Sequence, residues 1–514
     1  MEKRTHTHQW PRLALAPLSA ALLAAGLTAS VPALAAGGHD DSPPRMSPAA
    51  APVDHDEEAF GPDPSYEEKP YDIEAQLEIY GGKRAVNNPR PAIEIGQPIY
   101  VAGQLETPGH GWGAKNPSAH AFSVYGDWRN AVAWNDNGVV ETGQVATRLN
   151  LDLDWKLTGT ERLHASVRPL DNNGDFTRCE VAGDTPDDCQ LKFDLNPDTL
   201  FFEGDLGAIS AGFTDEYSSF DLPIAFGKMP LLFQNGVWME DIITGVAFTL
   251  PALNSPSMDI SNMDITFLAA FDDVSSGGMI EPTGQVAEHG ANLFAVTAFV
   301  EANQGYWEFG YGFTDGEDNL DDQDYHNITA AFTKRYGGWL SNSVRVIHNF
   351  GQDRIGGAAE TADGTLFLIE NSLITSKPLT LVPYANLFLG LDTPQSLARD
   401  AGAGGVLKNT GINFETDGLT GFPTLDATAR NTWGGALGIQ YLFNLDQQIV
   451  FEVATVQTIG DAAGRNAPGE QYGVGLRYQY VLDEKWLLRA DAMFGSRENL
   501  ENISGIRFEI RRKF

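Results

Sequence analysis

The last ten residues of the chain alternate between two chemistries with a period of two. In the segment 505–514 (GIRFEIRRKF), bulky apolar residues share one parity, with Arg512 as the single exception, and every residue of the other parity after Gly505 is charged. Successive side chains of a β-strand point to opposite faces, so this pattern predicts a strand with one apolar and one charged face. Such a strand fits the wall of a transmembrane β-barrel, and the alternative is an edge strand of a soluble sandwich.

The same alternation recurs along much of the chain. The clearest case is 148–157 (RLNLDLDWKL), in which every second residue from Leu149 is large and apolar and the others are charged or amides. No soluble core needs such a polar face unless that face meets water. Further segments with this pattern are 162–167, 263–271, 306–313, 434–443, 449–455, 474–482 and 486–494, and the more uniformly apolar segments 292–301 and 379–390 are also expected to be strands.

Short and long links between these segments alternate along the chain. Short links are expected at 303–305, 336–338, 376–378, 444–446 and 483–484, and long ones at 171–197, 272–291, 315–324, 350–364, 391–431, 459–469 and 496–502. Transmembrane barrels have short periplasmic turns and longer extracellular loops, so their links alternate in this way. We therefore predict an all-β fold, a transmembrane antiparallel β-barrel over residues 71–514 with about 18 strands (roughly 16 to 20).

The start of the chain predicts export. Basic residues precede the uncharged apolar run 13–31, and Ala33-Leu34-Ala35 follows it directly. This order is typical of a secretory signal peptide, here residues 1–35, with cleavage after Ala35. The next stretch, 36–70, is rich in Pro, Ala, Asp and Glu, and we expect a disordered periplasmic linker.

The location follows from what a membrane allows. No segment after the signal peptide approaches the roughly 20 apolar residues that a spanning helix needs. Only helices and closed barrels satisfy their backbone hydrogen bonds in lipid, so a membrane location requires a barrel. We predict the cell outer membrane, with lipid and lipopolysaccharide against the outer face of the barrel.

Charge and motif content argue against several function classes. The formal net charge of −35 argues against nucleic-acid binding, which requires basic patches. The G-x-S-x-G, H-E-x-x-H and P-loop spacings are missing, and His164, His326 and His348 lie in no triad-like context. We therefore predict no enzyme activity, no cofactor and no metal site.

Cys179 and Cys189 lie ten positions apart within the expected loop 171–197. An exported chain meets an oxidising periplasm, so we expect them to form a disulfide that stiffens this loop. With no C-x-x-C spacing and no nearby histidine, a redox or metal role is not expected.

Strand parity identifies the charged residues that would face the barrel interior. Several of them are basic although the net charge of the chain is negative. This suggests that the acidic residues lie mainly in the loops and the linker, while the lumen carries a ladder of basic residues. Such a channel would select passively diffusing small hydrophilic solutes by pore radius and rings of charge, with a preference for anions. The predicted lumen-lining residues are Arg148, Asp152, Asp154, Lys156, Arg162, Arg168, Arg345, Arg477, Arg489, Asp491, Arg507 and Arg511.

The sequence of two segments does not decide whether the pore is open, constricted or plugged. The stretch 218–241 is notably apolar and too long for a plain hairpin, so it is either a constriction folded into the pore or a strand plus a loop packed on its own side chains. Together with 391–431 it could also plug the barrel, which would then be a non-conducting surface-binding or adhesion protein. A third alternative is a secreted soluble β-protein.

Over residues 71–514 the chain resembles Gram-negative outer-membrane porins. The stretches RLNLDLDWKLTGTERLHASVRPL and GKMPLLFQNGVW look more specifically like the alginate-export branch of single-chain barrels. That resemblance implies a monomeric barrel that conducts a hydrophilic solute, with polysaccharide export as an alternative, although this chain is far more acidic than an exporter of a polyanion. Phe508, Ile510 and Phe514 resemble the signal by which the barrel-assembly machinery recognises its clients.

Overall fold

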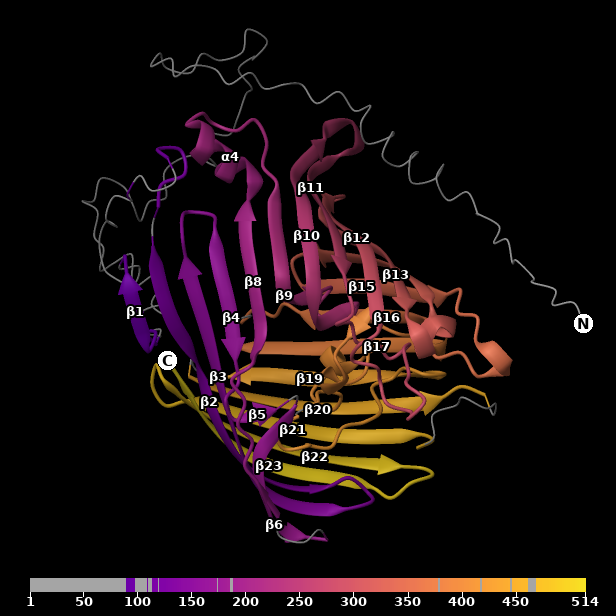
Figure 1. The fold of residues 1–514 in the computed structure, drawn as a ribbon. Helices are drawn as coiled ribbons and strands as arrows, with labels where there is room; N and C mark the ends of the chain where they lie inside the picture. The colour runs from indigo at the N-terminus through magenta and orange to yellow at the C-terminus, as the bar shows by residue number, and fades with distance from the viewer. Residues whose placement is uncertain are drawn as a thin grey trace, which may run out of the picture. The chain divides into compact units, whose positions relative to one another are not determined.

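The computed structural model describes residues 89–97, 109, 113–118, 120–172, 174–184, 188–377, 380–416, 418–443, 446–460 and 468–514. The predicted signal peptide and linker, and the first residues of the predicted barrel, lie outside these ranges. The described residues form an all-β fold, a closed antiparallel β-barrel (Figure 1), which confirms the predicted fold class. None of the described helices is long and apolar enough to cross a membrane.

The barrel is built from strands that each pair with the next one along the chain. Its uninterrupted strands are β2 (Ala121–Asp136), β3 (Glu141–Lys156), β9 (Pro223–Phe233), β10 (Met239–Ser255), β11 (Ile260–Ala270), β12 (Ala291–Ala302), β13 (Gly305–Gly316), β14 (Tyr325–Tyr336), β15 (Leu340–Phe350), β16 (Asp363–Leu373), β17 (Leu381–Thr393), β19 (Thr432–Leu442), β20 (Gln447–Thr458), β21 (Gln471–Val481), β22 (Trp486–Arg497) and β23 (Ile503–Lys513). The barrel closes because β23 pairs antiparallel with β2, from Asp127 opposite Lys513 to Asp136 opposite Ser504.

Two positions in the wall are each filled by a pair of shorter strands. β4 (Arg162–Val167) and β6 (Asp175–Gly183) pair in line with the two halves of β3. β8 (Pro197–Asp205) pairs with β4, and β7 (Asp188–Gln190) pairs with β6. With these pairs, the barrel has 18 strand positions, within the predicted range. Three short strands lie outside this count: β1 (Ile93–Gly96), β5 (Asp171–Asn172) and β18 (Ala398–Arg399).

The prediction of one long loop over 171–197 is therefore wrong. Asn172 and Gly174 do mark a turn, but the chain then resumes pairing with β3 from Thr177 onward. The turn residues of this stretch concealed the strand that follows them, because turn signals are local and strand pairing is not. Cys179 and Cys189 lie directly opposite each other on β6 and β7 and form a disulfide.

The two faces of the strands meet different surroundings. On β23, Phe508 is 58% exposed on the outer surface, while Arg507 is 1% exposed inside the barrel. Ile506 and Ile510 lie outside with Phe508, and Glu509 lies inside with Arg507. The apolar sets therefore form the outer surface, as the alternation predicted.

The interior holds two folded-in segments. One is the link 394–431, which carries β18 and the short 3-10 helices η5 (Ala401–Ala403) and η6 (Lys408–Thr410). The other is the turn 234–238 between β9 and β10. Leu397, Leu407 and Phe414 of the link are fully buried in one apolar cluster with Trp238 of the turn. We call these segments the lumen loop (394–431) and the lumen turn (234–238).

The strand links differ between the two ends of the barrel. The end where β2 begins carries mostly short links, such as 303–304 and 482–485, and also a longer one that contains α4 (Leu206–Thr214). The other end carries most of the long links, among them 271–290 and 459–470, and also the short link 137–140. The remaining 3-10 helices are η2 (Pro256–Met258) at the first end, and η3 (Asp318–Gln323) and η4 (Ile355–Gly357) at the second.

Candidate functional site

A group of arginines lines one side of the lumen. Strand parity points them inward, and the register sets them side by side: Arg477 lies opposite Asp491, which lies opposite Arg507. Arg129 lies opposite both Arg148 and Arg511. We call this group, carried by β2, β3, β21, β22 and β23, the arginine wall: Arg129, Arg148, Arg477, Arg489, Arg507 and Arg511.

Shared carboxylates hold these guanidiniums close together. Asp491 contacts Arg477 at 2.7 Å, Arg489 at 2.8 Å and Arg507 at 2.7 Å. Glu509, buried, contacts Arg511 at 2.9 Å and also pairs with Arg129. Asp491 and Glu509 thus each serve more than one arginine, and Asp127 of β2 contacts Arg511 at 3.4 Å. The six arginines still outnumber the carboxylates on this wall, and charge-assisted bonds fix the geometry.

Arg148 differs from its neighbours on the wall. Its guanidinium lies 5.0 Å from the ring of Phe176 on β6, and its Nε is buried without a hydrogen-bond partner. Among the described residues, no carboxylate lies within ion-pairing distance of it. Arg148 therefore adds to the lumen a positive charge that no direct ion pair neutralises, with Asp171 and Asp127 acting on it only from a greater distance.

The other charged residues predicted on β3 and β4 also have inward parity, and several form ion pairs. Arg162 contacts Asp154 at 3.2 Å, and Arg168, just beyond β4, contacts Asp198 at 3.3 Å. Asp152 shares the parity of Asp154, and Lys156 lies opposite Arg162. This part of the lumen carries charges of both signs.

The predicted lumen residue Arg345 lies apart from the arginine wall, on β15. It is buried and contacts Glu370 of β16 at 2.9 Å. The pair lines a cavity of about 380 Å³ with Glu308 and the stacked rings of Phe299 and Tyr306. The structure thus brings Arg477, Arg489, Asp491, Arg507 and Arg511 together and leaves Arg345 in a separate, mixed-charge environment.

The lumen loop is anchored to the barrel wall by Glu452 of β20. This carboxylate is 0% exposed and accepts hydrogen bonds from the backbone N–H of Ile412 at 2.9 Å and of Asn413 at 2.8 Å. It also accepts from the Asn413 side chain and from the hydroxyl of Tyr384. A carboxylate satisfied by several donors costs less to bury, and it fixes this part of the loop.

The lumen loop and the lumen turn hold each other inside the barrel. The Leu397 N–H donates to the carbonyl of Trp238 at 2.8 Å, and the Trp238 indole donates to Asn327 of β14 at 2.9 Å. Glu240, just after the turn, pairs with both Arg399 and Lys408 of the loop. The stretch 218–241 is therefore mainly strand, but its turn does fold into the pore.

Glu415 of the lumen loop reaches the arginine wall. Its carboxylate contacts Arg477 at 2.6 Å and Arg489 at 3.3 Å. Burial alone would raise the pKa of the Glu415 carboxyl, but the charges of the two arginines outweigh that effect and lower its pKa below the usual value. Glu415 and Arg477 line a cavity of about 340 Å³ together with Lys408 and Tyr384. We call it the amide cavity because its lining also includes several amide side chains, among them Asn386, Gln440, Gln448 and Gln479.

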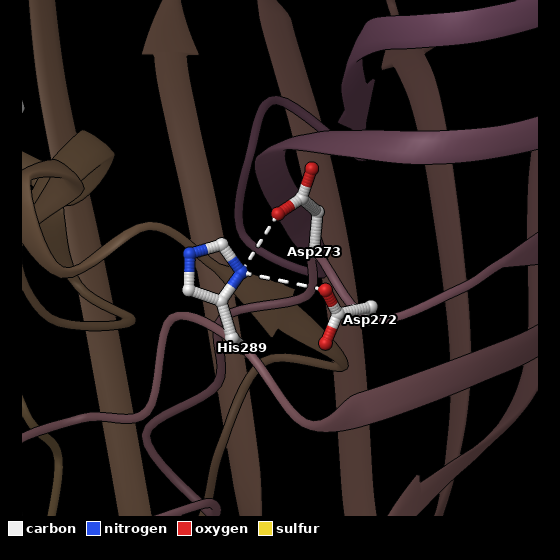
Figure 2. A group of neighbouring side chains, drawn as sticks. All are labelled: Asp272, Asp273 and His289. Atoms are coloured by element: carbon white, nitrogen blue, oxygen red, sulfur yellow. Dashed lines mark ion pairs between the residues drawn. The ribbon is translucent and has the colours of Figure 1, made fainter.

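A possible cation-binding group lies on the link 271–290. Figure 2 shows the imidazole of His289 directed at both Asp272 and Asp273. His289 Nδ1 lies 2.8 Å from Asp273 and 3.7 Å from Asp272. Imidazole and carboxylates can bind divalent metals, but Asp272 and His289 are largely exposed, and in the structure the three side chains satisfy one another as ion pairs.

Sequence reasoning missed several residues of this site. Arg129 and Glu509 obey the strand parity, and the sequence signal for them was present in the segments 121–136 and 505–514. Glu415 lies in a loop without alternation, and Glu240 is the second residue of β10, where the sequence gives no sign of its partners in the lumen loop.

No protein-family model matches the sequence, and no curated protein matches it either. The fold is similar to solved outer-membrane channels of Pseudomonas aeruginosa. OccK11 (OpdR) aligns with a TM-score of 0.50 and 10% identity over 76% of this chain and 96% of its own. OpdK, solved with vanillate, aligns with a TM-score of 0.51 and 13% identity over 76% of this chain and 98% of its own. These likenesses do not support the alginate-export branch.

Proposed function

We propose that the protein is an outer-membrane channel for passive diffusion of small hydrophilic solutes, with a preference for anions. The observation that carries this proposal is the arginine wall, which lies in a lumen narrowed by a folded loop. A channel of this kind selects solutes by radius and by lumen charge, with no chemistry on the solute. The lumen loop would set the radius, and the excess of guanidinium over carboxylate would set the sign of the preferred charge.

Two further lines support the proposal. The fold is similar to that of OpdK, a channel solved with vanillate, a small solute. The signal-peptide pattern at 1–35 and the terminal residues Phe508, Ile510 and Phe514 fit export and insertion by the barrel-assembly machinery. The apolar outer surface would then contact lipid and lipopolysaccharide.

The test is a reversal-potential measurement on the purified protein in a planar bilayer under a potassium chloride gradient. We expect anion preference, and we expect Arg148→Gln to weaken it because this variant removes a lumen charge that has no direct ion pair among the described residues. The control is Arg354→Gln, which removes an arginine that pairs with Asp322 in the links at the barrel end. Clear cation preference of the unaltered protein would contradict the proposal.

The alternative of a plugged surface-binding barrel rests on the dense packing of the lumen loop. It predicts a correctly folded barrel that conducts nothing under any applied voltage. Polysaccharide export is a weaker alternative, because the lumen loop crosses the space that a polymer would need. We assign no catalytic role.

A further inference from the structure

Glu415 connects the lumen loop to arginines of the arginine wall, the groups that would bind an anionic solute. Arg477 and Arg489 each contact Asp491 on the wall as well as Glu415 on the lumen loop. Without Glu415, the ion pair with Asp491 would be the one left to Arg477 and to Arg489 among the described residues. The carboxylate of Glu415 therefore occupies the position where these arginines would otherwise bind an anion.

Glu415 differs from Glu452, the residue that anchors the lumen loop to the barrel wall. Glu452 is fully buried and accepts hydrogen bonds from the loop backbone. Glu415 has 32% of its side chain exposed, and among the described residues its hydrogen bonds come from the two guanidiniums. Loss of the Glu415 contact would therefore leave the loop fastened at residues 412–413.

The amide cavity gives a solute access to this contact. Its volume of about 340 Å³ suits a small molecule, and Glu415 and Arg477 both line it. Its amide side chains both donate and accept hydrogen bonds without adding charge. The cavity also contains Lys408, which pairs with Glu240. A small carboxylate in the cavity would therefore meet neutral polar groups, this paired lysine and the contact between Glu415 and the arginines.

We propose that Glu415 is a tethered competitor, a carboxylate of the protein that stands in for the carboxylate of a solute and is displaced by it. This inference rests on the proposed channel function. A tethered group has an effective concentration in the millimolar range, so it lowers the affinity of the arginines for solute without abolishing it. Conduction requires binding that is strong enough to admit a solute and weak enough to release it, and Glu415 sets that balance.

The experiment uses the full-length mature protein in planar bilayers, with chloride as the current carrier and succinate as the probe. Glu415→Gln keeps the size of the side chain and removes its charge. We expect the succinate concentration that halves the chloride current to fall about tenfold, since the competitor is lost. Glu415→Asp keeps the charge and is expected to retain the weak block of the unaltered protein.

Glu370→Gln is the matched control. It also removes a paired carboxylate from the lumen, but Glu370 pairs with Arg345, away from the arginine wall. If Glu370→Gln strengthens the succinate block as much as Glu415→Gln does, the stronger block comes from the loss of a negative lumen charge at any position, and the inference is wrong.

Two other outcomes separate the inference from the proposed function. Conducting Glu415→Gln channels with an unchanged succinate block would overturn the competitor role and leave the channel function standing. Folded protein that conducts nothing, with or without the substitution, would overturn both.

Discussion

At the scale of single residues, buried carboxylates decide where the lumen loop lies. Glu452 is inaccessible to solvent, yet it faces backbone and side-chain donors of the loop and the hydroxyl of Tyr384. A buried charge is tolerated only when hydrogen bonds replace its hydration. The same donors would be costly to leave without an acceptor, so this residue and the loop depend on each other.

Glu452→Ala tests this dependence. The substitution leaves the N–H groups of Ile412 and Asn413 without their acceptor, at about 1–3 kcal/mol for each buried group. We expect the lumen loop to loosen, and trypsin to cut the folded protein faster after Lys408 and Arg399. The rate of appearance of these fragments in detergent measures the effect.

The control is Glu308→Ala, which also removes a carboxylate from the lumen. Glu308 lines the cavity beside Arg345 and, among the described residues, forms no hydrogen bond with the loop. If trypsin cuts after Lys408 at the same rate in both variants, Glu452 is not the residue that anchors the lumen loop.

At the scale of elements, the inner faces of some strands are shaped to receive the lumen segments. A Cβ atom at Gly310 of β13 would lie 2.5 Å from the ring of Trp238, and one at Gly312 would lie 2.3 Å from Leu397. Both glycines have inward parity, so the lumen turn and lumen loop pack directly against the backbone of β13. Close approach of this kind is a reason for glycine within a strand.

The link between β13 and β14 is expected to respond to pH. Burial raises the pKa of Asp324 to about 6, and the charges of Asp315 and Asp321 add to that effect. The folded state therefore keeps a proton that the unfolded chain releases near pH 4, so the stability of this link is greatest at low pH and falls as pH rises from about 4 to about 6.

Asp324→Asn keeps an oxygen that can accept from the Gly316 N–H and removes the charge. We expect this variant to protect the link 317–324 more strongly than the native residue at pH 7 and to lose the pH dependence. Hydrogen exchange of this segment, after correction for the intrinsic rate at each pH, gives the measurement. Asp318→Asn, at an exposed position of the same link, serves as the control, and a native-like pH dependence in Asp324→Asn would contradict the assignment.

At the scale of the whole molecule, one strand pair closes the barrel. The last hydrogen bonds of that pair join Phe514 to Gly126, with N–H to carbonyl distances of 2.8 and 3.1 Å. The final strand therefore carries the predicted assembly signal and also forms the seam with β2. A defect at its end affects closure of every strand, because a barrel has no free edge.

Deletion of Phe514 tests the seam and the signal together. We expect less folded barrel in the outer membrane, because the variant loses both hydrogen bonds to Gly126 and the terminal aromatic side chain. The heat-modifiable fraction on semi-native gels measures the yield. Phe443→Ala, an exposed aromatic residue next to β19, is the control, and equal yields of the two variants would contradict the role of Phe514.

Much of the fold could be predicted from the sequence. The alternation at 148–157 and 505–514 identified the outer and inner faces of β3 and β23, and the number of such segments, with the even total expected of a barrel, led to the strand count. These features are local, because a period of two is a property of neighbouring residues in one strand. The same parity pointed Arg477, Asp491 and Arg507 toward the lumen before their contacts were known.

The partners of those charges could not be predicted. Asp491 serves three arginines because the register places β21, β22 and β23 side by side. Glu415 reaches Arg477 across a separation of 62 residues, and Glu240 reaches Lys408 across 168. No local sequence pattern predicts which loop folds into the lumen of the barrel.

The chain by itself therefore determined that a barrel forms and which face of each strand meets water, since both follow from side-chain alternation and from the need of a membrane-embedded backbone for internal hydrogen bonds. Only the tertiary structure decided that the lumen is narrowed by 394–431 and that Glu415 lies on the arginine wall. The physical reason is that closure of the barrel brings distant segments into one enclosed space, where packing against glycines and shared ion pairs determines which loop stays inside.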